Sequence, residues 1–262
     1  MANDTVVKTL IVAGVLSVVC SALVSSSAVL LRPEQARNKD LDRKKNILQS
    51  AGIYDPDQTI DDQFSRFDIK VVDLATGEFR DDVDTATFDQ RKAAKSADLG
   101  IDVPKDEDIA GIKRRSLYAL IYLAKDDSGS LEQLILPVHG KGLWSTLYGY
   151  LALDADLSTI NGFAFYQHGE TPGLGGEVDN PRWKEQWVGK KAFDDEGATR
   201  IQVLKGKTDP SNPDVNYQID GLSGATITTR GVDALLQYWL GSNGFGPLLK
   251  ELKTKEGGND NG

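Results

Sequence analysis

The sequence predicts an α+β fold, in which an antiparallel sheet with flanking helices follows one N-terminal transmembrane helix. Residues 9–31 form a long, uncharged apolar run. Residues 116–167 contain four β-rich segments separated by short turns, and such neighbours pair as antiparallel strands. Residues 229–240 carry apolar side chains at helical spacing. Strands that follow one another directly, with helices at the ends, indicate α+β architecture.

The composition of the 262-residue chain excludes several classes of protein. The formal net charge is −9, and no cluster of Lys and Arg with interleaved aromatic residues marks a nucleic-acid-binding surface. The single cysteine, Cys20, excludes an intrachain disulfide, a cysteine-based zinc site and a protein-held iron–sulfur cluster. His139 and His168 are the only histidines, so a protein-bound haem or copper centre would be poorly supplied with ligands.

Residues 9–31, TLIVAGVLSVVCSALVSSSAVLL, are expected to cross a membrane after a short tail, residues 1–8. The run is uncharged between Lys8 and Arg32. A helix of this length, at about 1.5 Å per residue, spans a hydrocarbon core of about 30 Å. The alternative is a cleaved signal peptide, with Lys8 as its basic region and VSSSA as its cleavage site. Because the apolar run continues past that site to Leu31, we favour an uncleaved anchor.

The charges beside this segment favour a cytoplasmic position for the rest of the chain. The positive-inside rule counts Lys and Arg near the ends of a membrane helix, and these are concentrated after the apolar run. They are Arg32, Arg37, Lys39, Arg43, Lys44 and Lys45.

Residues 32–114 are expected to form a connecting helix and a peripheral acidic lobe. The segment from Pro33 to about Ala51 indicates the helix. Residues 55–110 are rich in Asp and lack strong periodicity, which indicates turns and short helices. Their aspartates do not have the spacing of a calcium-binding loop, so a solvated acidic face is the better interpretation.

Residues 115–255 are expected to form the main domain, and residues 256–262 a flexible tail. Two hairpins come first, one with the turn DDSG and one around residues 155–157. Two shorter β-rich segments and the helix from about residue 229 follow. The expected strands are residues 116–125, 130–138, 147–154, 159–167, 200–206 and 215–220.

The stretch DGLSGATITTRGV, residues 220–232, combines two glycines with four hydroxyl side chains. An apolar helical pattern follows at once, so the turn lies at a helix N-terminus, where free N–H groups and the helix dipole favour an anion. The simpler alternative is an N-cap, in which Thr228 or Thr229 accepts a backbone N–H for about 1 kcal/mol. A cap explains one hydroxyl but not four.

Motifs for other chemistries are absent or incomplete. No segment supplies the P-loop G-x-x-x-x-G-K-[ST] or the dinucleotide fingerprint G-x-G-x-x-G. GLSGA comes close to the nucleophile elbow G-x-S-x-G, but Ala225 replaces the last glycine, and no histidine follows His168 as that fold requires. A serine hydrolase acting through Ser223 is therefore a weak alternative.

Residues 220–228, DGLSGATIT, match the flavinylation motif D-g-x-[ST]-g-A-T-x-[ST] position by position. The chain therefore resembles the FMN-binding domain family. Its uncharged N-terminal segment, LDRKKNIL and HGETPGLGGEVDNPRW extend the resemblance, over nearly the full length, to the C subunits of sodium-translocating NADH:quinone oxidoreductases. The G subunits of Rnf electron-transport complexes are the related alternative, and the long lobe before residue 115 favours the C subunits.

The resemblance implies that Thr228, the last hydroxyl of the motif, carries FMN through a phosphoester to the ribityl phosphate. A separate flavin transferase, using FAD and Mg²⁺, would attach it. Thr229 is the local alternative, and alignment to the motif favours Thr228. Asp220 would serve either the turn or recognition by the transferase. Further flavin-binding residues in the motif would be Ser223, Gly224, Ala225 and Thr226.

Residues 168–176, HGETPGLGG, form a second glycine-rich loop, and an ordinary surface turn is the alternative interpretation. Trp144 would stack beside the flavin or else lie in the core. Lys205 would place a cation near the ring or else be solvated. Neither histidine is given a catalytic role, and no metal site is expected. The loop residues that the resemblance places at the flavin are Glu170, Thr171, Leu174 and Gly175.

The resemblance implies a membrane-anchored subunit that relays electrons through covalent FMN, in a complex that oxidises NADH, reduces ubiquinone and exports Na⁺. Its partners would be the other subunits, the flavin transferase and the membrane, with no nucleic acid. It would be a single-pass protein of the bacterial inner membrane with a periplasmic flavin domain, opposite to the side that the charge rule favours. A module that binds FMN without a covalent bond, and a structural protein without flavin, are the alternatives.

Overall fold

The structure, a computed structural model, describes residues 5–126 and 128–259. The chain divides into two compact units, Met1–Lys44 and Lys45–Gly262.

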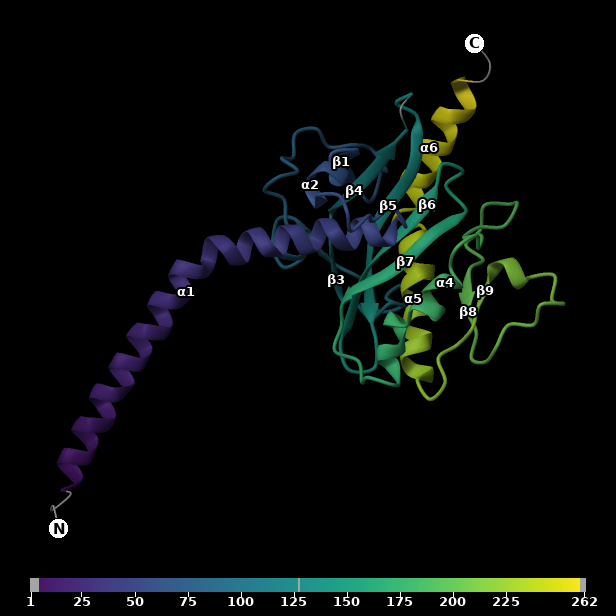
Figure 1. Cartoon of the computed structure of the whole chain (residues 1–262). Helices are drawn as coiled ribbons and strands as arrows, with labels where there is room; N and C mark the ends of the chain where they lie inside the picture. Colours follow the sequence, from purple (N-terminus) through teal and green to yellow (C-terminus); the bar gives the residue numbers. More distant parts are fainter. Residues whose placement is uncertain (1–4, 127, 260–262) are drawn as a thin grey trace. The chain divides into compact units, whose positions relative to one another are not determined.

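Most of the first unit belongs to one long helix, α1, which runs from Val6 to Ser50 (Figure 1). The expected membrane segment and the expected helix after Pro33 are therefore parts of a single helix. Pro33 lies inside it, where its ring removes one backbone N–H from the helical ladder. Side chains of α1 are exposed as far as Lys39. Among the described helices, α1 is the one long and apolar enough to cross a membrane. A signal sequence near the N-terminus would meet the same criteria of length and composition.

The second unit is built on a five-stranded antiparallel sheet with the order β1-β4-β5-β6-β7. The four hairpin strands expected from the sequence occupy four of these positions, which confirms the antiparallel α+β architecture. Tyr122 lies opposite Ile135, and Leu151 lies opposite both Leu136 and Phe163, so each strand buries apolar side chains against the next. The strands are β1 Phe67–Asp73, β4 Tyr118–Lys125, β5 Leu131–Lys141, β6 Thr146–Asp154 and β7 Ile160–Gln167.

Strand β1 corrects the expectation that residues 55–110 contain only turns and short helices. It pairs with β4 along its whole length, from Phe67 opposite Ala124 to Asp73 opposite Tyr118. Residues 67–71 alternate apolar and charged side chains, a strand pattern that the Asp-rich surroundings obscured. Charges are suited to the edge of a sheet, where they discourage pairing with another chain. The rest of this region has the short helices expected, α2 Ile60–Phe64 and α3 Gln90–Ala93. The short antiparallel pair of β2 Gly100–Asp102 with β3 Arg114–Ser116 was not expected.

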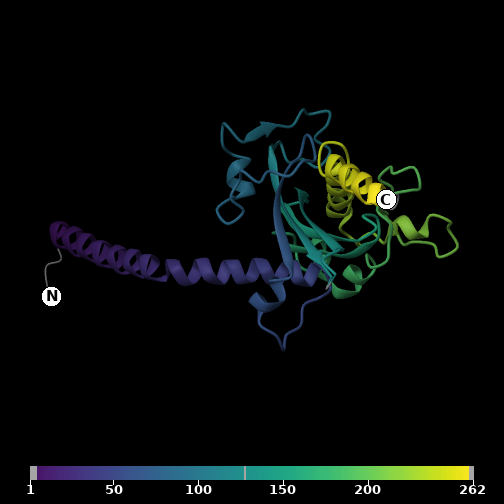
Figure 2. The same ribbon diagram turned by 90° about the horizontal axis from the view of Figure 1, so that it is seen from above.

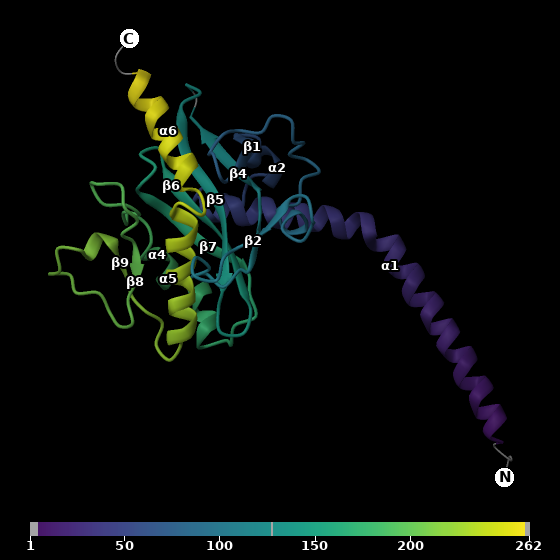
Figure 3. The same cartoon turned by 180° about the vertical axis from the view of Figure 1, so that it is seen from behind.

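The two faces of the sheet carry separate apolar clusters. Alternate residues of β4 point to opposite faces, with Ile121 in one cluster and Tyr122 in the other. The last turn of α1 and helix α2 cover the Tyr122 face through Leu48 and Phe64. The opposite face is covered by α5 Thr226–Leu240 and α6 Gly246–Asn259 (Figures 2 and 3).

Helix α5 lies close to strand β5 because two glycines leave room for it. A Cβ atom at Gly140 would lie 2.6 Å from the Cβ of Leu235, and one at Gly231 would lie 2.3 Å from the carbonyl oxygen of Lys141. Trp239 of α5 also donates its indole N–H to the carbonyl oxygen of His139, at 2.6 Å. These contacts hold α5 against the end of β5 along most of the helix.

The last two expected strands shrink to a two-residue parallel pair, β8 Gln202–Val203 and β9 Gln218–Ile219. Two side chains of α5 form hydrogen bonds with backbone groups in and beside β8, which in a longer sheet would bond to a neighbouring strand. Asp233 accepts the N–H of Val203 at 2.8 Å, and Gln237 donates to the carbonyl oxygen of Ile201 at 2.6 Å. The remaining short helices are η1 Gly175–Asp179, α4 Pro181–Glu185 and η2 Val215–Tyr217.

Candidate functional site

The turn before α5 differs from the simple cap that the sequence allows. Helix α5 begins at Thr226, three residues earlier than expected, and Ala225 is its N-cap without a side-chain hydrogen bond. Neither Thr228 nor Thr229 is therefore the N-cap. Thr229 instead accepts the backbone N–H of Leu222 at 3.1 Å, which closes the turn from within the helix. Gly224 has φ +74°, a conformation that favours glycine.

Thr228 is fully buried and faces a carboxylate. Its hydroxyl donates a hydrogen bond to Oε2 of Glu170, with 2.6 Å between the oxygens. The exposed fraction is 0% for Thr228 and 6% for Glu170. The sequence separates the two residues by 58 positions. The fold therefore brings the last hydroxyl of the turn and the acid of the second glycine-rich loop into one hydrogen-bonded pair.

Three consecutive backbone N–H groups hold the Glu170 carboxylate in place. Leu143, Trp144 and Ser145 donate to it at 3.2, 2.9 and 3.1 Å. Burial raises the pKa of the Glu170 carboxyl, but the hydrogen bonds from Thr228 and these N–H groups outweigh burial and lower its pKa below the usual value. Glu170 is consequently a carboxylate at neutral pH.

Glycines make this pairing possible. A Cβ atom at Gly142 would lie 2.7 Å from Oε1 of Glu170, and one at Gly175 would lie 2.5 Å from the hydroxyl oxygen of Thr228. Both distances are shorter than ordinary contacts, so a side chain at either position would displace the pair.

The loop after β7 is fixed to its surroundings at both ends. Ser145 accepts the N–H of Gly169 at 2.6 Å, and His168 bonds through Nε2 to Asp179 at 2.7 Å. Leu174 lies against the turn before α5, because a Cβ atom at Gly224 would be 3.1 Å from its Cδ2. The loop and the turn expected to share the site do meet.

An exposed apolar rim borders the buried pair. It consists of Leu143, Trp144, Leu174 and Ile227, which are 41%, 68%, 45% and 57% exposed. Of the two interpretations of Trp144, a position in the core is therefore wrong. Leu143 and Trp144 themselves donate their backbone N–H groups to the carboxylate, and Leu174 and Ile227 directly precede Gly175 and Thr228. A buried hydroxyl, a helix N-terminus and an apolar rim together suit a ligand with a phosphate and a flat ring.

The remaining predicted residues lie on this turn, on the loop after β7 and just after β8. Ser223 and Gly224 are exposed, Thr226 is half-buried and Ala225 is buried, while Thr171 is exposed on the loop. Lys205 is also exposed. Its backbone lies against the turn, since a Cβ atom at Gly221 would be 3.0 Å from the carbonyl oxygen of Lys205.

Comparison with known proteins decides the family. The FMN-binding domain family matches residues 142–241. The C subunit of the Na(+)-translocating NADH-quinone reductase of Pseudomonas aeruginosa is 50% identical over 261 residues, covering 98% of this chain and all of the relative. The chain belongs to this C-subunit family. The full-length identity confirms the resemblance to these C subunits.

Other relatives agree with this assignment. The reductase C subunit of Yersinia pestis is 43% identical over 264 residues, covering 99% of this chain and 97% of the relative. The crystal structure of Shewanella oneidensis NqrC has a TM-score of 0.76 at 35% identity, covering 83% of this chain and 99% of that one. The crystal structure of the reductase C subunit from Parabacteroides distasonis has a TM-score of 0.64 at 30% identity, covering 84% and 96%. The α+β fold is thus the fold of these C subunits.

In this member of the family, Asp220 ties the motif to neighbouring loops. Its carboxylate accepts the N–H and the hydroxyl of Thr208, at 2.7 and 2.8 Å. Its N–H donates to Gln186 at 3.1 Å, and its carbonyl oxygen accepts the indole N–H of Trp183 at 2.8 Å. These three partners were not predicted from the sequence, because no local pattern links their positions to Asp220.

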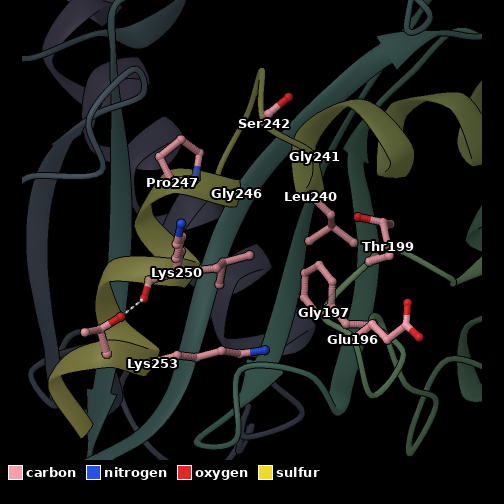
Figure 4. Close-up of a pocket in the computed structure, with 14 residues that line it drawn as sticks. Glu196, Gly197, Thr199, Leu240, Gly241, Ser242, Gly246, Pro247, Lys250 and Lys253 are labelled. Atoms are coloured by element: carbon pink, nitrogen blue, oxygen red, sulfur yellow. Dashed lines mark hydrogen bonds between the residues drawn. The ribbon is translucent and has the colours of Figure 1, made fainter. Parts of the chain in front are cut away.

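A cavity of about 740 Å³ lies elsewhere in the second unit (Figure 4). It is bounded by residues 193–199, the C-terminal end of α5 and the start of α6. None of the predicted site residues lines it, and α5 separates it from Thr228 by most of the helix length. The predicted residues of the motif and of the loop after β7 lie instead around the N-terminal end of α5.

Proposed function

We propose that this chain is a membrane-anchored electron carrier that holds one FMN through a phosphoester on Thr228. FMN would supply one- and two-electron redox chemistry. The observation that carries the proposal is the position of the Thr228 hydroxyl, which is paired with Glu170 in the first turn of α5 and bordered by an apolar rim.

The helix N-terminus supports a phosphate at Thr228. The N–H groups of a first helical turn have no partners within the helix, and an anion there gains about 0.3–1 kcal/mol from the helix dipole. Thr229 is a poorer attachment point, because its buried hydroxyl already accepts the N–H of Leu222 and closes the turn. The glycines at 142, 175 and 224 leave space where a side chain would crowd the loop and the turn.

The apolar rim supports a ring system beside the phosphate. Trp144, Leu174 and Ile227 expose large apolar side chains that a flavin ring would cover. Thr171 would offer a hydroxyl to the polar edge of the ring. Lys205 would place a cation near the flavin, where positive charge stabilises its reduced anionic form.

The anchor and the relatives' names support a place in a membrane complex. Residues 9–31 of α1 would form a single membrane span in the bacterial inner membrane, residues 32–114 a connecting region, and residues 115–255 the part that holds FMN. The complex would oxidise NADH, reduce ubiquinone and export Na⁺, with the other subunits and a flavin transferase as partners. We place the flavin domain in the periplasm. Protease treatment of intact spheroplasts would degrade a periplasmic domain and spare a cytoplasmic one.

The proposal is tested by whether flavin stays with the denatured chain. The protein would be produced with and without a flavin transferase, unfolded in detergent and separated by size. Flavin fluorescence that migrates with the chain only after exposure to the transferase is the expected result. Flavin that binds the folded protein but separates on unfolding would establish the alternative, a noncovalent FMN module.

A further inference from the structure

Two buried groups at the site face each other as an acid–base pair does. The Thr228 hydroxyl lies 2.6 Å from Oε2 of Glu170, and Glu170 is nearly inaccessible to solvent. A threonine hydroxyl is a weak nucleophile until an adjacent base removes its proton. A candidate base must lie within hydrogen-bonding distance of that proton, and Glu170 meets this condition before any ligand arrives.

The carboxylate is ionised and independently anchored. The hydrogen bonds that lower the pKa of Glu170 keep it charged, and three of them come from residues 143–145, just before β6. Once the Thr228 proton is transferred and a phosphate takes its place, one of these bonds is lost and a second negative charge lies nearby. Both changes raise the pKa of Glu170 and favour its protonated form.

We propose that Glu170 is the general base for attachment of FMN to this chain. The inference depends on the proposed attachment at Thr228. Glu170 Oε2 takes the proton as the O–H bond of Thr228 breaks, and Thr228 Oγ1 forms a bond to the phosphorus of the FMN half of a flavin dinucleotide. The P–O bond to the nucleoside monophosphate half breaks, and that half leaves with the bonding electrons. No oxidation or reduction takes place, and the proton stays on Glu170.

The arrangement also explains why Glu170 can remain in place while the site opens. Gly175 lies against the Thr228 hydroxyl, so we expect residues 171–176 to move when a phosphorus atom approaches that hydroxyl. Glu170 is held from outside that segment, by the N–H groups of residues 143–145. The base and the nucleophile therefore stay together while their cover moves.

The test is the initial rate of FMN attachment to the full-length protein, followed by intact mass with a saturating flavin transferase and FAD. Glu170→Gln keeps the shape and an acceptor oxygen but cannot take a proton, and its rate should fall about 100-fold or more. Glu177→Gln is the matched control, because Glu177 bonds to Asn180 instead and its variant should load at the wild-type rate. Wild type that does not load refutes the proposed attachment itself. Wild type and Glu170→Gln that load equally fast refute only the general base.

A rescue experiment separates proton transfer from mere positioning. Glu170→Ala leaves three N–H donors and the Thr228 hydroxyl around a small space, into which formate fits. Formate should restore attachment, whereas nitrate, a planar anion that is almost non-basic, should not. Equal rescue by both anions would show that Glu170 only positions Thr228.

Infrared spectra decide the question if the variants do not fold. The difference between loaded and unloaded wild type should show the loss of one carboxylate and the gain of one carboxylic acid. A difference spectrum without these bands would overturn the proposal.

Discussion

Replacement of Gly175 by Ala tests the packing around Thr228 most directly. The added Cβ would lie 2.5 Å from the hydroxyl oxygen of Thr228 and 2.8 Å from Oε2 of Glu170. Gly175 is outside the left-handed region, so alanine suits its backbone and the effect is one of space alone. Overpacking costs about 1–3 kcal/mol. A lost hydrogen bond to a charged group costs about 1.5–3 kcal/mol.

Because the two costs overlap, we expect Gly175→Ala to lower the free energy of unfolding by about 2–4 kcal/mol. For a unit of this size the corresponding fall in Tm is about 5–15 °C. Tryptophan fluorescence during heating of the full-length protein in detergent measures it. Gly206→Ala is the matched control, because a Cβ there meets nothing within 4 Å. Equal Tm values for the two variants, with equal FMN attachment, would refute the described packing.

Three further predictions concern other parts of the second unit. Asp220→Ala removes both hydrogen bonds to Thr208 and should lower the free energy of unfolding by about 1–3 kcal/mol, whereas Asp220→Asn should lower it less. Urea denaturation compares the two variants, and equal losses of stability would contradict the assigned bonds. Burial, and then the charge of Arg91, lowers the pKa of His139 to about 4 in the folded protein. Protonation therefore favours unfolding, so about 2–3 kcal/mol of stability should be lost as pH falls from about 6.5 to about 4. His139→Gln should abolish this loss of stability between about pH 6.5 and about pH 4. If the free energy of unfolding of the variant depends on pH as that of the wild type does, the lowered pKa of His139 is contradicted. Trp144→Ala should change stability by less than about 0.5 kcal/mol, because the side chain is exposed, yet alter flavin fluorescence in the loaded protein; a large fall in Tm would show that Trp144 has a packing role.

Local patterns predicted the four central strands and the helix that follows, because their apolar periodicity is strong. Strand β1 was missed although Phe67, Ile69 and Val71 alternate with Asp68 and Lys70, because this short pattern lies within an Asp-rich region that was interpreted as irregular. The start of α5 was placed three residues late. Thr226 and Ile227 were assigned to the turn, but they belong to the first turn of the helix.

The site could be predicted in part. The nine-residue motif singled out Thr228, and the resemblance singled out Glu170 as a residue near the flavin. That the two would form a buried hydrogen bond could not be inferred, because they are 58 positions apart and the contact depends on α5 packing against β5. The role of Asp220 was left open for the same reason, since its partner Thr208 lies on a separate loop.

The central claim, covalent FMN on Thr228, is tested most directly by the mass of the denatured chain. Wild type, Thr228→Ala and Thr228→Ser would each be produced with a flavin transferase, and their peptides mapped by mass spectrometry. We predict an added mass of one FMN less one water on the wild-type peptide that contains Thr228, retained in Thr228→Ser and absent from Thr228→Ala. An unmodified wild-type chain, or a modified Thr229, would contradict it.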